Sequence, residues 1–421
     1  MQTIARPAPI LAALSILLSV AFLIMGNGLQ LMLLPIRGGI EGFSSFQIGL
    51  LGSGYFFGFV LGCAFTPRMI MGVGHIRTFA ALVAIASAAA LGYPMALDAI
   101  IWIVLRMITG FCLAGLYLVV ESWLNDQATN ETRGLLISTY VTVNFTVITL
   151  GQMMVTLFQP TSFVLFSIAS VLVSLAAVPI VMTRSSQPPP ITVVRFRPMR
   201  MFRLSPTGTV SIFLIGLATG SFWSLAPSYA STVSGSVGDA ALFMSAAVLG
   251  GAFAQLPAGK ISDRVDRRKV LIALAAGCAV VGVALALTSG TPYYWLGLGA
   301  AFGAGLLPSY AIAAAHVFDF ADRSDYVEIS AGLLLLNGMG STIGPMLSSV
   351  SIEIWGQQGF FVANAAIQIA LIGFVGFRLS QREGLPVDEK QNFDLGTSAA
   401  VSVVGDEGAV QLSDLVVQEP T

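Results

Sequence analysis

Long apolar stretches alternate with short polar ones along most of the chain. Each stretch is close to the roughly 20 residues that a helix needs to cross a bilayer. The pattern predicts an all-α integral membrane protein with twelve transmembrane helices. The predicted spans are residues 8–34, 46–66, 78–96, 99–121, 135–158, 162–182, 208–230, 239–258, 270–288, 294–317, 327–349 and 357–379.

The composition agrees with a membrane environment. Hydrophobic residues make up 56% of the chain and charged residues only 10%, against roughly 25% charged in soluble domains. The net charge of −1 indicates neither an acidic nor a basic partner, and no basic surface interleaved with aromatic residues suggests nucleic acid. Cys63, Cys112 and Cys278 all fall inside apolar stretches, which favours packing roles over disulfides or metal ligands.

The segment Gly259–Lys269 is the densest charge cluster in the chain, with seven charged residues among eleven. Such a segment cannot lie in hydrocarbon, whereas the apolar stretches on either side can. It therefore reads as a short turn between the eighth and ninth spans. Its excess of Lys and Arg predicts a cytoplasmic location, because positive residues in short loops are retained on that side.

That assignment orients the whole chain. With twelve crossings and a cytoplasmic amino terminus, 18 of the 20 Lys and Arg fall on the cytoplasmic side, all except Arg37 and Arg106. Residues 183–206 carry three consecutive prolines and five arginines, which predicts a cytoplasmic linker. We expect a multi-pass protein of the cytoplasmic membrane with both termini in the cytoplasm.

The linker divides the spans into two groups of six, residues 1–182 and 207–380, followed by an acidic tail over 381–421 that we expect to be flexible. The two groups repeat each other. At an offset of 192 residues, Gly28 matches Gly220 and Gly58 matches Gly250, and at 195 residues Gly110 matches Gly305. Two parallel six-span repeats are typical of transporters that rock around a central site.

Several motifs resemble signatures of the major facilitator superfamily. The segment Gly259–Arg268 is similar to the loop signature G-x-x-x-D-[RK]-x-G-[RK]-[RK], with Asp266 where Gly is usual. The counterpart at Pro67–Arg77 lacks the acid. Arg106–Gly110 resembles the fourth-span signature R-x-x-x-G, and Glu121–Asn125 and Gly340–Pro345 resemble the YcaD-like permeases of this superfamily.

The resemblance covers about residues 8–380 and implies a fold of two pseudo-symmetric six-helix bundles. It also implies a cytoplasmic gate that latches one transport state. The residues of this gate are Gly259, Asp263, Arg264, Arg267 and Arg268. The alternative is that these charges only set topology. Proton-driven drug exporters usually carry G-x-x-x-G-P in the fifth span, and Thr149–Gln152 departs from it, which weakens a drug-export interpretation.

The predicted function is secondary transport of a small solute by alternating access. We find no phosphate-binding loop with Lys, no metal-ligand cluster and no nucleophile with a His partner, so neither an enzyme nor a cofactor nor an ATP-driven pump is expected. Energy would come from an ion gradient, with the proton as a candidate, or from the solute itself. The expected partners are the solute and the lipid bilayer, and we expect a monomer. A multidrug-type efflux permease and a non-transporting receptor or scaffold are the alternatives.

Arg106 is the principal binding candidate. It lies seven residues past the start of its span, roughly 10 Å below the outer boundary. A charge at that depth must be paired or must face water. We expect it to face a central cavity, where it holds an anionic group or tunes a proton site. The alternative is a bond to backbone carbonyls of a neighbouring helix.

Glu121 and His316 are candidates for proton coupling, at corresponding ends of the fourth and tenth spans with the same offset of 195 residues. Asp319 is three residues after His316 and hence on the same helical face. A histidine beside a carboxylate titrates near neutral pH and could relay protons. Helix-end polar residues also serve as ordinary interfacial anchors, and that interpretation stays open.

Further polar residues inside the spans mark where a cavity could lie, because an amide in lipid needs a partner. Trp223 and Ser224 could add a stacking surface and a hydroxyl. Hydrogen bonding between helices is the alternative for each. The amide candidates are Asn27, Gln30, Asn144, Asn337, Asn364 and Gln368.

Overall fold

The computed structural model describes residues 9–127, 132–182, 197–288, 290–291, 294–322 and 325–381. Within these residues, twelve helical segments are long and apolar enough to cross a membrane, as predicted. The first six spans are α1 (Pro9–Ile40), α2 (Ser45–Val73), α3 (His75–Met95), α4 (Ala99–Gln127), α5 (Arg133–Met153) with the 3-10 turn η1 (Met154–Thr156), and α6 (Phe163–Leu175) with α7 (Ala177–Val181). After the short helix α8 (Pro198–Leu204), the others are α9 (Pro206–Ser234), α10 (Val237–Arg264), α11 (Arg267–Leu287), α12 (Trp295–Leu306) with α13 (Ser309–Phe318), α14 (Tyr326–Trp355) and α15 (Gly359–Gln381).

Local sequence signals fix several helix ends. Ser44 and Gln47 form a reciprocal capping box at the start of α2, which satisfies two backbone donors that have no partner within the helix. Ser236 accepts a hydrogen bond from the backbone of Asp239 at the start of α10. Gly235 ends α9 with a φ of 65°, a left-handed conformation that a residue without a side chain adopts at little cost. These residues fix where α2 and α10 begin and where α9 ends.

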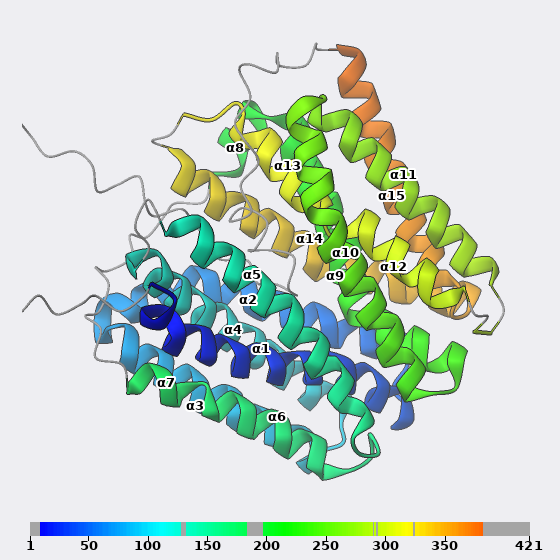
Figure 1. Ribbon diagram of the computed structural model, residues 1–421. Coiled ribbons are helices and arrows are strands. Elements are labelled where there is room, and N and C mark those ends of the chain that lie inside the picture. The colour runs from blue at the N-terminus through cyan, green and yellow to red at the C-terminus, as the bar shows by residue number, and fades with distance from the viewer. Residues whose placement is uncertain are drawn as a thin grey trace, which may run out of the picture.

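The helices pack as two bundles (Figure 1). In the first bundle, α1 packs on α5 and α6, while α4 packs on α2 and α3. In the second, α9 packs on α14, α10 on α12, and α15 on α11. The bundles meet where α2 contacts α14 and α9, where α10 contacts α5, and where α1 contacts α9.

Glycine packing shows that the two bundles are built alike. A Cβ added at Gly58 would overlap the carbonyl of Met107, and one at Gly250 would overlap the carbonyl of Ala300. These pairs bring α2 against α4 and α10 against α12, with the glycines 192 residues apart and their partners 193 apart. The same relationship links Gly151, packed on the Met25 carbonyl, with Gly344, packed on the Leu217 carbonyl. The predicted repeat therefore exists as matched helix-helix contacts.

The predicted match of Gly110 with Gly305 at an offset of 195 is wrong. Gly110 packs on the carbonyl of Tyr55, and the residue that packs on the corresponding carbonyl of Ala247 is Gly303, 193 residues after Gly110. Gly305 instead approaches Leu274 and Cys278 of α11. Spacing alone could not separate two glycines a half-turn apart on one helix.

The charge cluster Gly259–Lys269 is more helical than the predicted turn. Helix α10 continues to Arg264 and α11 begins at Arg267, so only Val265 and Asp266 lie between them. Lys and Arg are good helix formers, so a helix that leaves the hydrocarbon has no reason to stop there. Part of the predicted linker is helical as well, as α8, whereas residues 183–196 and the predicted tail from residue 382 onward lie outside the described residues.

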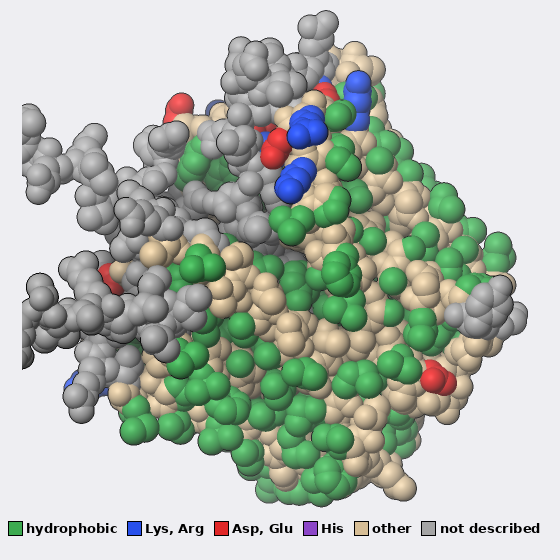
Figure 2. Space-filling view, viewed as in Figure 1, with side chains coloured by type: hydrophobic (Ala, Val, Ile, Leu, Met, Phe, Trp, Pro, Cys, Tyr) green, Lys and Arg blue, Asp and Glu red, His purple; other side chains and the backbone are tan. Residues whose placement is uncertain are grey.

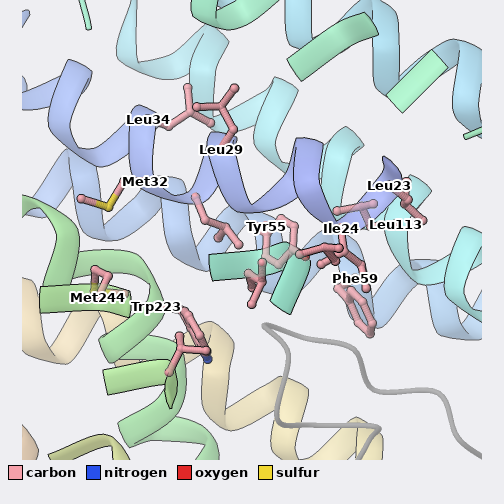
Figure 3. Close-up of a cluster of buried hydrophobic side chains, with 14 of the residues drawn as sticks. Leu23, Ile24, Leu29, Met32, Leu34, Tyr55, Phe59, Leu113, Trp223 and Met244 are labelled. Carbon is pink, nitrogen blue, oxygen red and sulfur yellow. The ribbon is translucent and has the colours of Figure 1, made fainter. Parts of the chain in front are cut away.

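The buried core runs through both bundles and across their junction. Figure 3 shows Met32 and Tyr55 of the first bundle in the same buried cluster as Trp223 and Met244 of the second. Outward-facing positions are also apolar, as at Phe253, Leu287 and Ile369, which are 78%, 80% and 62% exposed. Hydrophobic side chains cover much of the visible surface, while several Lys and Arg gather at one end of the second bundle (Figure 2). This surface suits lipid contact.

Candidate functional site

The end of the bundles at which α10 meets α11 carries an ion-pair network, and we call it the charged end. Its centre is Arg267, only 1% exposed at the start of α11. Arg267 Nε lies 2.8 Å from Asp319 Oδ2, and Nη2 lies 3.3 Å from Asp319 Oδ1. Nη1 donates to Ser262 Oγ at 2.9 Å and to Asp263 Oδ1 at 3.1 Å. One guanidinium therefore ties together α10, α11 and the end of α13.

Asp319 thus belongs to the charge network. The sequence grouped it with His316 as a proton relay, but its carboxylate takes the two-pronged geometry that a guanidinium favours. His316 lies near Phe320, with ring centroids 5.2 Å apart, and its charge acts on the Asp266 carboxylate. Arg323, four residues after Asp319 in the sequence, lies outside the described residues.

The remaining gate candidates divide by exposure. Gly259 is buried and its carbonyl accepts a hydrogen bond from Ser262 Oγ at 2.7 Å, whereas Arg264 is exposed at the end of α10. Arg268 is 5% exposed, pairs with Asp266 at 2.7 Å, and reaches the carbonyl of Arg378 on α15 at 3.5 Å. Gly259, Asp263, Arg267 and Arg268 therefore take part in hydrogen bonds or ion pairs at the charged end, whereas the side chain of Arg264 is exposed to solvent.

Asp266 replaces the usual glycine of the loop signature, and its role is visible. Its carboxylate caps α11 by accepting from the backbone of Arg268 at 3.0 Å. Partial burial alone would raise the pKa of Asp266, but hydrogen bonds from Arg268 and the charges of Arg268 and His316 outweigh it, so the pKa lies below its usual range. Asp266 is therefore ionised at neutral pH.

Arg106 lies inside the first bundle. It is 4% exposed, and its guanidinium carbon lies 4.4 Å from the centroid of the Tyr55 ring. Trp102 and Thr109, on the same face of α4, both contact Tyr93 of α3. None of the ion pairs found among the described residues includes Arg106, and its Nη1 has no hydrogen-bond acceptor there.

Tyr93 of α3 is a protein partner of Arg106, since its hydroxyl interacts with the guanidinium as well as with Thr109. The predicted alternative, a bond to carbonyls of a neighbouring helix, is not among the hydrogen bonds of the described residues. The aromatic face of Tyr55 meets part of the charge. Tyr55 also belongs to the buried cluster that includes Trp223 across the bundle junction (Figure 3). Sequence reasoning missed Tyr55, although a polar aromatic in the glycine-rich second span is a signal.

Glu121 is buried near the charged end of α4. Tyr140 of α5 donates to Glu121 Oε1 at 3.5 Å, a long contact. The neighbouring Ser122 Oγ lies 3.2 Å from His75 Nε2 at the start of α3. Since the bundles correspond at an offset of 193 on this helix, Glu121 matches Ala314, so the predicted correspondence of Glu121 with His316 is wrong.

The amide candidates occupy related places. Asn144 and Asn337 are 193 residues apart and so correspond in the repeat, one on α5 and one on α14. Asn27, Gln30 and Gln368 are at most 2% exposed, and both side-chain polar atoms of Asn27 lack a partner among the described residues. Asn364 donates to the carbonyl of Ala218 at 3.2 Å, which is the predicted alternative of bonding between helices. Ser224 packs on Gly52, at the bundle junction.

Comparisons with known proteins agree with this arrangement. The family model described as Major Facilitator Superfamily matches residues 208–410. An uncharacterized MFS-type transporter of Enterobacter sp. (strain 638) is 26% identical over 375 residues, which cover 87% of this chain and 94% of the relative. The uncharacterized MFS-type transporter YcaD of Shigella flexneri is 24% identical over 373 residues, again covering 87% and 94%.

Solved structures share the fold. The nucleoside transporter NupG superposes with a TM-score of 0.72 at 13% identity, covering 88% of this chain and 100% of that one. A bacterial homologue of the human lysosomal transporter Spinster, in an inward-facing and unoccupied conformation, gives a TM-score of 0.69 at 14% identity, covering 96% and 99%. The second half of this chain thus matches the Major Facilitator Superfamily model, and 87% of the chain is similar in sequence to MFS-type transporters such as YcaD, with twelve candidate membrane spans.

Proposed function

We propose that this protein moves a small anionic solute across the cytoplasmic membrane by alternating access, with Arg106 as the group that binds the anion. The observation that carries the proposal is the buried guanidinium of Arg106, which has an aromatic ring on one side and no acid as a partner in the described part of the chain. A guanidinium keeps its proton at physiological pH, so its charge needs a counter-charge or water. A solute carboxylate or phosphate would supply that charge.

Tyr55 connects Arg106 with the junction between the bundles. Its ring lies over the guanidinium, and the same side chain belongs to the cluster that contains Trp223 and Met244 of the second bundle. A solute that reaches Arg106 from the junction would have to displace this ring. Tyr55 would then exchange its contact with the cation for one with the apolar part of the solute. Met32, Trp223 and Met244 suit a solute that carries an apolar body beside its charge.

The arrangement of contacts supports a state that is closed away from the charged end. A Cβ added at Gly49 or Gly52 would overlap Ser349 or Ser224, so α2 lies directly against α14 and α9 of the other bundle. These contacts lie in the first turns of α2, at the end opposite the charge cluster, and the bundles separate toward the charged end (Figure 1). With the charged end in the cytoplasm, as its Lys and Arg favour, this state faces inward.

Energy coupling is the second part of the proposal. We infer that a proton gradient drives transport and that Glu121, buried on α4 beside Tyr140, is the coupling acid. Glu121→Gln should then retain solute exchange between equal concentrations while losing accumulation driven by a pH gradient.

Transport into sealed vesicles tests the function. Purified protein reconstituted with a panel of labelled organic anions should accumulate at least one of them, and Arg106→Ala should lose that uptake. Arg68→Ala is the matched control, because Arg68 is exposed and its contacts, the carbonyl of Ala64 and the ring of Phe65, lie on its own helix. Uptake of neutral apolar compounds alone, equal in both variants, would instead indicate a multidrug-type permease. A cysteine placed at Arg200 tests the orientation, since labelling by an impermeant reagent from outside would contradict it.

A further inference from the structure

The repeat relates two residues of the first bundle to the centre of the charge network. His75 begins α3 as Arg267 begins α11, and the two are 192 residues apart. Asp126 lies near the end of α4 and Asp319 just past the end of α13, 193 residues apart. These are the offsets that the glycine contacts establish for the same helices. The first bundle therefore has a histidine where the second has Arg267, opposite an equivalent aspartate.

The surroundings of His75 support this correspondence. The imidazole is 2% exposed, and its Nε2 lies 3.2 Å from Ser122 Oγ on α4. The ring lies beside Trp123, with centroids 6.0 Å apart. Asp126, one turn further along α4, is exposed, and its charge acts on the imidazole. Ser122 thus faces His75 much as Ser262 faces Arg267, although Ser122 comes from α4 and Ser262 from α10.

The other charged side chains on the helices around His75 contact other groups or are exposed. On α2, Arg68 bonds to the carbonyl of Ala64 and lies over Phe65. On α3, Arg77 is exposed, and on α4 the carboxylate of Glu121 contacts Tyr140. Helices α6 and α7 carry no charged residue. Among these elements, Asp126 is the charged group that acts on His75.

We propose that His75 and Asp126 form a proton-binding site at the charged end of the first bundle. Without the proton, the neutral imidazole of His75 is hydrogen-bonded to the hydroxyl of Ser122. When His75 takes a proton from water at the exposed side of Asp126, the imidazolium and the Asp126 carboxylate form the counterpart of the Arg267–Asp319 pair. A histidine makes that pair dependent on pH, whereas arginine makes it permanent. The junction of α2, α3 and α4 would therefore tighten in acid while the junction of α10, α11 and α13 would not change.

This inference does not depend on which solute is moved, so its test needs none. The chain contains two histidines, His75 and His316, so histidine-labelled protein in detergent gives two sets of imidazole NMR signals. Either His75→Gln or His316→Gln assigns them. Titration with protons as the ligand between about pH 5 and pH 8 covers the range in which histidines change charge.

The expected result is that His75 titrates within this range and that its midpoint moves to lower pH in Asp126→Asn. The His316 midpoint should stay unchanged in that variant, and Asp322→Asn, which removes an exposed acid at the charged end of the second bundle, should leave the His75 midpoint unchanged. A His75 signal that does not titrate, or a midpoint that Asp126→Asn leaves in place, would overturn the proposal. An equal shift of both histidines would also overturn it, because it would reflect net charge alone.

Discussion

Arg267 and Asp319 form a two-pronged ion pair whose side chains are 1% and 3% exposed. Asp263 contacts the same guanidinium from four residues earlier in the chain, but its own side chain is 27% exposed. The two acids therefore differ in their surroundings, although each is a single charge beside Arg267. Loss of one partner from a buried pair leaves an uncompensated charge, whereas an exposed partner is replaced by water.

Asp319→Asn should accordingly destabilise the protein far more than Asp263→Asn. We expect a loss of about 3–5 kcal/mol for the buried pair and less than about 1 kcal/mol for the partly exposed one. Thermal unfolding of the purified variants measures the difference. Asp322→Asn, an exposed acid three residues after Asp319, is the control. Equal melting temperatures for Asp319→Asn and Asp263→Asn would show that Asp319 is not the principal partner.

The close contact of α2 with α4 should tolerate no added side chain. A Cβ at Gly110 would overlap the carbonyl of Tyr55, so Gly110→Ala forces the helices apart, and Gly303→Ala should do the same in the second bundle. Gly72→Ala and Gly277→Ala are matched controls, because a Cβ at either position meets nothing within 4 Å. Yield of monodisperse protein and melting temperature should fall for the first two variants only. Similar losses for all four would mean that glycine is needed for reasons other than close packing.

A side chain at Gly52 should open the contact between the bundles. Gly52→Val would overlap Ser224 on α9 and so disfavour the state in which the bundles meet at the end opposite the charge cluster. Spin labels at Phe43 and Ser236, in the turns before α2 and α10, should report longer distances in the variant than in the parent. Gly72→Val, with open space around it, should leave the distance distribution unchanged. An unaltered distribution in Gly52→Val would contradict the closed contact.

The Asp266 carboxylate should contribute to stability at neutral pH and lose that contribution only in acid. Its pKa in the folded protein lies below the ordinary value of 3.8, so its favourable contribution is present above that value and is lost as the pH falls through the folded pKa. Asp266→Asn keeps a side chain that can cap α11 while removing the charge. The difference in melting temperature from the parent protein should persist from about pH 7 to pH 5 and shrink below about pH 4. A difference that disappears already near pH 6 would mean that the pKa is raised.

The sequence predicted the twelve spans well, because hydrocarbon thickness forces a long apolar pattern that leaves few alternatives. It also singled out Arg106 and Glu121, which are buried in the structure, since polar residues inside apolar spans stand out. It could not tell which polar groups meet. Asp319 lies three residues from His316 and 52 from Arg267 along the chain. The fold nevertheless places Arg267, at the start of α11, within hydrogen-bond distance of Asp319 at the end of α13.

The correspondence between residues of the two bundles could be predicted only in part from the sequence. The match of Gly110 with Gly305 depended on sequence spacing alone. Gly303 and Gly305 are only two residues apart on α12, so spacing could not decide which of them corresponds to Gly110. Backbone contacts at Gly303 settled the offset at 193, and this change moved the counterpart of Glu121 from His316 to Ala314. The counterpart of Arg267 could have been found from the sequence, because Arg68 and Arg77 lie 192 residues before Lys260 and Lys269, and His75 lies between Arg68 and Arg77.

A substitution of Arg106 that keeps the charge tests whether its guanidinium binds the anion. Arg106→Lys retains a cation but loses the planar, two-pronged donor geometry. The measurement is the affinity of the folded protein for matched carboxylate and amide solutes, such as benzoate and benzamide, by ligand-induced thermal stabilisation on the same preparation that gives the melting temperature. We expect a carboxylate to stabilise the parent protein more than its amide does. In Arg106→Lys, which should still fold, the affinity for the carboxylate should fall at least tenfold while the affinity for the amide stays the same. Unchanged carboxylate affinity in the folded fraction of Arg106→Lys, with only the melting temperature lowered, would contradict binding of the anion by Arg106.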